Sequence, residues 1–142
     1  ETGRYTVSDR VLQAVQAEFS CGFCTDAQGA QTIGKTFREK QYLLDTHTAV
    51  ACTVLDAYRA ETGDGTLTVV ESTASPFKFC ASVLDALGVT EHAPGTGVLD
   101  QLTKETGRPA PKPLASLAGK AARFDQITDR ADMRAVVTEF LR

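Results

Sequence analysis

The chain has 142 residues, a net charge of −3, and a composition that is 42% hydrophobic and 23% charged, as in an ordinary globular domain with its own core. The small negative charge excludes the basic surface that nucleic-acid binding requires, so we expect no nucleic-acid partner. No apolar run approaches the roughly 20 residues of a membrane-spanning helix, so we expect no membrane partner.

Two helical patterns open the chain. Residues 8–20 place apolar side chains at helical spacing behind Ser8, a suitable N-cap. Thr25 and Gln28 have the form of a capping box that starts a second helix. Two glycines inside this second helix indicate close packing against another backbone, or less commonly a ligand: Gly29 and Gly34.

A third helix begins at Asp45 or Thr46, either of which is a suitable cap, and Gly63 is suited to end it. Its apolar stripe is formed by Val50, Ala51, Val54, Leu55 and Tyr58. The next segment, residues 66–71, is rich in β-branched and apolar residues, which predicts a buried strand.

A further helix follows Ser75 and Pro76, an N-cap and a first helical residue. Its apolar face is formed by Cys80, Val83, Leu84 and Leu87, and Gly88 ends it. Helix, strand and helix in succession predict a helix-rich α/β fold, part of a layered αβα domain with a small sheet.

The rest of the chain is divided by prolines and glycines. Residues 93–121 are interpreted as a connector with a short helix around residues 98–102 and an extended stretch at 108–113. Residues 124–127 are a candidate edge strand, and residues 128–141 a terminal amphipathic helix. We therefore treat residues 1–142 as one unit, with an α/β core in residues 1–90.

The cysteines are interpreted as free thiols in a reducing cytoplasm: Cys21, Cys24, Cys52 and Cys80. Cys21 and Cys24 form a C-x-x-C pair, but a zinc site needs four converging ligands. His47 or His92 would have to complete it, and no strand precedes the pair as in redox motifs. We therefore predict no metal site.

Residues 71–78 are where the sequence favours ligand binding, because ligands of open α/β sheets bind at the carboxyl ends of strands. Ser72, Thr73 and Ser75 supply hydroxyls there, a helix N-terminus favours anions, and Lys78 adds a positive charge. The structural alternative is that these hydroxyls cap local backbone and Lys78 is solvated. His47 is interpreted as a packed or capping residue, and no residue is predicted to be catalytic.

Two segments resemble the C-terminal part of threonine synthases: Tyr42-Leu-Leu-Asp-Thr-His-Thr-Ala-Val50 and Val69-Val-Glu-Ser-Thr-Ala-Ser-Pro-Phe-Lys-Phe79. The similarity spans residues 25–88, with a weaker match at residues 3–7. Thr46 stands where the family usually has proline, and Ser75 where it usually has histidine. The second change puts any role of that imidazole in doubt here.

The resemblance implies a pyridoxal-phosphate lyase that converts O-phospho-L-homoserine and water to L-threonine and phosphate. It implies that Thr73, with Ser72, meets the cofactor and that Lys78 contacts the substrate. The Schiff-base lysine and the phosphate-binding loop of such enzymes belong to an earlier part of the chain, and we recognise neither here.

We therefore expect an inactive C-terminal fragment that binds no cofactor by itself, whose partner is the missing N-terminal part and which is prone to self-association. The opening Glu1-Thr2-Gly3, without an initiator methionine, is consistent with a cut inside a longer protein. The alternative is a self-contained, non-catalytic helical interaction domain.

Overall fold

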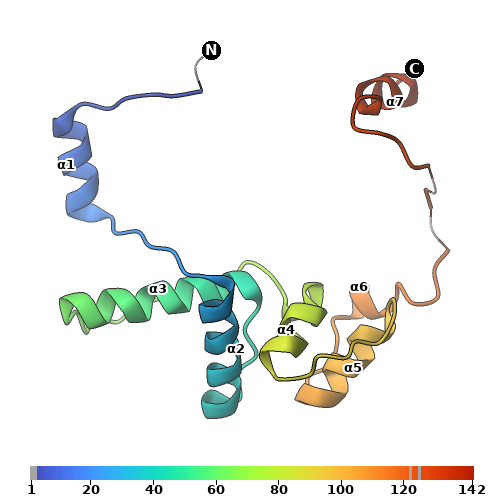
Figure 1. Ribbon diagram of the computed structural model, residues 1–142, viewed down its shortest axis with the longest axis horizontal. Coiled ribbons are helices and arrows are strands. Elements are labelled where there is room, and N and C mark those ends of the chain that lie inside the picture. Colours follow the sequence, from blue (N-terminus) through green and yellow to red (C-terminus); the bar gives the residue numbers. More distant parts are fainter. Residues whose placement is uncertain (1–2, 122, 125) are drawn as a thin grey trace.

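The computed structural model describes residues 3–121, 123–124 and 126–142, and within these ranges the ordered elements are all helical (Figure 1). They are α1 (Asp9–Glu18), α2 (Asp26–Lys40), α3 (Thr46–Thr62), the 3-10 turn η1 (Pro76–Lys78), α4 (Cys80–Ala86), α5 (Gly97–Thr106), α6 (Lys112–Ala115) and α7 (Met133–Phe140). No described residue forms a strand, so the predicted α/β class with a small sheet is wrong. No described helix combines the length and the apolar character needed to cross a membrane.

The first three predicted helix starts are confirmed, because each depends on residues two to four positions apart. Ser8 accepts a hydrogen bond from the Val11 amide at 3.4 Å. Thr25 and Gln28 form a complete capping box. Asp45 caps α3, and Gly63 ends that helix in the left-handed region with φ 71°.

The core lies where α2, α3, α4 and α5 meet. α2 contacts both α3 and α4, and α4 contacts α5 and η1. The buried apolar side chains are Ile33, Leu44, Ala49, Phe77, Cys80, Val83, Leu84, Leu99 and Leu102. Residues from both resembling segments are among them, so these segments are part of the packed centre.

The two interior glycines of α2 differ in their surroundings. A Cβ on Gly34 would lie 2.6 Å from the carbonyl oxygen of Ala86 in α4, whereas the nearest atom to one on Gly29 is the Cys24 sulfur at 4.0 Å. The prediction of close approach to another backbone is therefore confirmed for Gly34 and wrong for Gly29.

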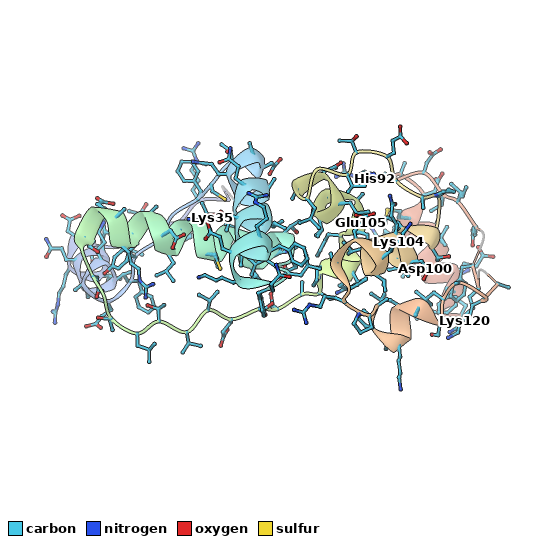
Figure 2. All side chains as sticks on the ribbon, turned by 90° about the horizontal axis from the view of Figure 1, so that it is seen from below. Lys35, His92, Asp100, Lys104, Glu105 and Lys120 are labelled. Carbon is cyan, nitrogen blue, oxygen red and sulfur yellow. The ribbon has the colours of Figure 1, made fainter. Side chains whose placement is uncertain are left out.

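Residues 66–71, the predicted strand, run extended along α3 toward its N-terminal end, as Figure 2 shows. Arg59 of α3 donates to the Thr66 carbonyl at 2.9 Å and to the Thr68 hydroxyl at 3.1 Å. Leu67 and Val69 are 93% and 86% exposed. A strand needs a neighbouring strand for its backbone hydrogen bonds, and this segment has a helix beside it instead.

The apolar stripe of α3 faces this extended segment rather than the core. Val54, Leu55 and Tyr58 are half-buried, and with residues 68–71 they line a groove of about 440 Å³. The buried residues of α3 are Thr48 and Ala49 near its start. The helical spacing was therefore predicted correctly, but the stripe is not part of the core.

The region interpreted as a connector contains two helices. α5 covers the expected short helix and buries Leu99 and Leu102. α6 begins at Lys112, inside the stretch predicted to be extended, since Pro113 has a φ suited to a first helical turn. In the predicted edge strand at 124–127, Asp125 lies outside the described residues, and the three described ones form no strand.

The terminal helices α1 and α7 stand at the ends of extended segments, away from the central helices (Figure 1). Neither helix has a buried residue. α7 lies within the terminal helix predicted at residues 128–141 but begins later, at Met133. Its exposed apolar residues include Met133, Val137 and Phe140. Such uncovered apolar faces are typical of surfaces that contact another polypeptide.

Candidate functional site

The two resembling segments meet at the first turn of α3, around the carboxylate of Asp45. Asp45 is 1% exposed. Its Oδ1 accepts hydrogen bonds from the His47 amide at 2.9 Å and the Thr48 amide at 3.2 Å. This oxygen therefore performs the N-cap function that the sequence predicts for Asp45.

The other oxygen, Oδ2, accepts hydrogen bonds from side chains. The Ser72 hydroxyl donates to it at 3.2 Å across 27 residues of sequence. The Thr48 hydroxyl lies in contact with the same oxygen and is 2.9 Å from the Ser72 oxygen. Because each hydroxyl carries one proton, Ser72 donates to Asp45 while Thr48 donates to the carboxylate or to Ser72. Asp45 therefore links the start of α3 to the segment before η1.

The hydrogen bonds keep this carboxylate ionised despite its burial. Burial alone raises the pKa of Asp45, but donors from Thr48, His47 and Ser72 outweigh it, so the pKa lies below its ordinary value of 3.8. The site therefore contains a fixed negative charge inside a hydrogen-bonded network.

A second contact joins the segments on the other side of the turn. The imidazole of His47 lies against the ring of Phe79, with centroids 5.0 Å apart and planes tilted by 53°. Nδ1 of His47 is 3.6 Å from Oδ1 of Asp45, and the His47 side chain is 64% exposed. The prediction that His47 is a packed or capping residue is consistent with this placement.

The structure separates the roles of the two predicted cofactor-binding residues. Ser72 is engaged with Asp45 and Thr48. Thr73 is exposed, and its hydroxyl has no hydrogen-bond partner among the described residues. Thr73 is therefore the hydroxyl of this turn that is available to a ligand.

The other two residues of the predicted site are divided in the same way. Ser75 accepts a hydrogen bond from the Phe77 amide at 3.3 Å and caps η1. The helix predicted to run on from Pro76 is instead the short turn η1 followed by α4, which begins at Cys80. Lys78 is exposed and forms no side-chain hydrogen bond or ion pair within the described residues. Thr48 is not among the residues predicted for the site, although its position three residues after the cap is a signal for its contact with Asp45.

A cavity of about 430 Å³ lies beside this cluster. Thr46 and Phe79 line it from the candidate site, and α4 contributes Ser82 and Asp85. Its lining also includes residues at and just before the start of α2, namely Cys24, Thr25 and Gly29. Both resembling segments thus contribute a wall to one cavity.

The cysteines do not assemble into a metal site in the described part of the chain. No group of three or more histidine, cysteine or acidic side chains lies close enough there to hold a metal ion. All four cysteines are free thiols, with Cys21 exposed, Cys24 and Cys52 half-buried and Cys80 buried. The zinc alternative therefore has no ligand set in these residues.

Comparison with known protein families matches more than half of the chain, including part of the candidate site. The family model described as "Threonine synthase, C-terminal" matches residues 48–138. This range covers Thr48, Ser72 and Thr73 of the site, as well as all of α4, α5 and α6.

Relatives with similar sequences carry a related name. Threonine synthase-like 1 of Homo sapiens is 28% identical over 87 residues, which are 61% of this chain and 11% of that protein. Threonine synthase-like 1 of Mus musculus is 31% identical over 81 residues, 57% of this chain and 10% of that protein. The chain thus spans about a tenth of the length of the relatives it matches.

Proposed function

The chain belongs to the threonine synthase C-terminal family, and on that premise we propose that it forms one wall of a pyridoxal-phosphate site in a longer, threonine synthase-related enzyme. The proposed reaction converts O-phospho-L-homoserine and water to L-threonine and phosphate. The proposed setting is the cytoplasm, where free thiols persist.

The observation that carries the proposal is the pairing of an engaged and a free hydroxyl at one turn. Ser72 is bound to Asp45, whereas the neighbouring Thr73 is exposed and has no hydrogen-bond partner among the described residues. The Thr73 hydroxyl fits a pyridine nitrogen, because it can donate one hydrogen bond without adding charge.

When bound, pyridoxal phosphate supplies the electron sink that elimination of phosphate requires. Thr73 would hold the ring nitrogen through its hydroxyl. Ser72, engaged with Asp45, would line the same part of the site, and the exposed Lys78 would attract an anionic group of the substrate. The Schiff-base lysine and the loop for the cofactor phosphate are proposed to come from the preceding part of the longer protein.

The uncovered faces of α1 and α7 support a partner rather than a self-contained domain. Neither helix buries any of its residues, although both carry exposed apolar side chains such as Phe19 and Phe140. We propose that these faces contact the missing N-terminal part of the same protein. In its absence they would drive self-association of the chain.

Two assays test this function. The longer protein, supplied with pyridoxal phosphate and O-phospho-L-homoserine, is expected to release threonine and phosphate in equal amounts, whereas the 142-residue chain is expected to release neither above background. Turnover by the short chain would contradict its role as one wall of the site. A longer protein that binds the cofactor but leaves phosphohomoserine unchanged would contradict the proposed reaction.

A further inference from the structure

The segment that carries Thr73 has few attachments to the rest of the molecule. Among residues 69–74, all of which the structure describes, Ser72 is the one that forms hydrogen bonds, and both lead to the start of α3. The next attachments are Arg59 to Thr68 on one side and the Ser75 cap of η1 on the other. The hydrogen bonding of residues 69–74 to the rest of the molecule therefore runs through Ser72.

The two carboxylate oxygens of Asp45 accept hydrogen bonds from different kinds of group. Oδ1 receives the backbone amides of His47 and Thr48, which is the capping role. Oδ2 receives the hydroxyls of Thr48 and Ser72, which serves no capping purpose. A buried carboxylate acceptor makes stronger hydrogen bonds than a neutral one, so it is suited to fixing a segment that has no other hydrogen bond between Thr68 and Ser75.

We infer that Asp45 is a positioning residue, which acts through Ser72 to fix the segment 71–75 and so to present the Thr73 hydroxyl to its ligand. This inference rests on the proposed function for the identity of that ligand. The hydrogen bond from Ser72 to Asp45, here called the tether, is observed whatever that ligand is. The tether and the identity of the ligand are therefore tested separately.

The tether is tested on the chain without cofactor, by backbone ¹⁵N relaxation. We expect the Thr73 and Ala74 amides of the natural chain to have order parameters of about 0.85, and those of Ser72→Ala to fall below about 0.6. Ser72→Thr retains the hydroxyl and is expected to restore the natural values. Ser75→Ala, which removes a cap outside the Asp45 network, is the matched control and is expected to leave Thr73 ordered.

Asp45→Asn separates the two oxygens, because an asparagine carbonyl can still cap α3 while its amide group replaces the acceptor of Ser72. We expect α3 to stay intact, with mobility increased at residues 71–75. If the order parameters of Thr73 and Ala74 are unchanged in both Ser72→Ala and Asp45→Asn, the positioning role is wrong, whatever the ligand.

The link to Thr73 is tested in the longer protein by the affinity and absorbance of bound cofactor. Ser72→Ala is expected to weaken cofactor binding about tenfold in the natural background and to have little further effect in a Thr73→Val background, because residues that act as one unit are not additive. Equal effects in both backgrounds would overturn the action through Thr73. Loss of order in Ser72→Ala together with cofactor binding insensitive to Thr73→Val would contradict the proposed function and leave the tether established.

Discussion

Gly34 of α2 lies so close to Ala86 of α4 that a Cβ on Gly34 would be 2.6 Å from the Ala86 carbonyl oxygen. The neighbouring atom belongs to backbone, which cannot move aside as the end of a side chain can. Gly29 is buried in the same helix, but a Cβ there would meet nothing closer than 4.0 Å. The two positions therefore form a matched pair.

We expect Gly34→Ala to destabilise the chain by about 1–3 kcal/mol, the usual cost of overpacking. Gly29→Ala should stabilise it by up to about 1 kcal/mol, since alanine is the better helix former. Urea unfolding followed by helical circular dichroism measures both. Equal effects of the two substitutions would show that the α2–α4 contact is looser than the structure has it.

The depressed pKa of Asp45 makes stability dependent on pH in the acid range. The folded-state pKa lies below 3.8, so the stabilisation is present above the unfolded value and is lost as pH falls through the folded value. We expect the urea concentration at the unfolding midpoint to fall as the pH is lowered below about 4. The fall should be smaller in Asp45→Asn. Asp64, whose pKa is also lowered, chiefly by hydrogen bonds from Thr66, accounts for a remaining slope. Identical profiles for the natural chain and Asp45→Asn would contradict the ionised network.

The four cysteines should differ in reactivity. Burial raises the pKa of the Cys80 thiol, and burial together with the nearby Asp56 carboxylate raises that of Cys52. Because the thiolate is the reactive form, we expect a maleimide to label the exposed Cys21 first, and Cys52 and Cys80 only after unfolding. Mass spectrometry of the labelled peptides measures the order. Early labelling of Cys80 would mean that the core opens in the folded state.

Removal of the terminal helices should leave the central helices stable. Since α1 and α7 bury none of their residues, a chain limited to residues 21–121 should keep the same free energy of unfolding within about 0.5 kcal/mol. It should also sediment with less self-association than the whole chain, because the exposed apolar faces are gone. A large loss of stability would show that one of the removed terminal segments packs on the central helices.

Local signals predicted the helices well, and non-local contacts explain what was missed. The caps at Thr25 and Asp45 depend on residues within one turn, which a sequence displays directly. The strand at 66–71 was wrong because β-branched composition describes what a segment tolerates, while a strand requires a partner. No strand is present among the described residues to pair with this segment, and Leu67 and Val69 are exposed.

The contacts of the candidate site could be predicted from the sequence only in part, for a similar reason. Asp45 was recognised as a cap from its position before α3, but its second oxygen binds Ser72, 27 residues away. No local pattern contains that contact. The pairing of the two resembling segments was the one sequence signal that could have suggested it, because segments that recur together often meet in the fold.

The proposed function depends on Thr73 contacting the cofactor in the proposed longer enzyme. The most direct measurement is kcat/KM for threonine formation by the natural protein, Thr73→Ser and Thr73→Val. Loss of one hydrogen bond to the ring should reduce kcat/KM about tenfold or more in Thr73→Val, about 1.4 kcal/mol, while Thr73→Ser, which keeps the hydroxyl, stays near the natural value. Equal rates for all three proteins would contradict the account.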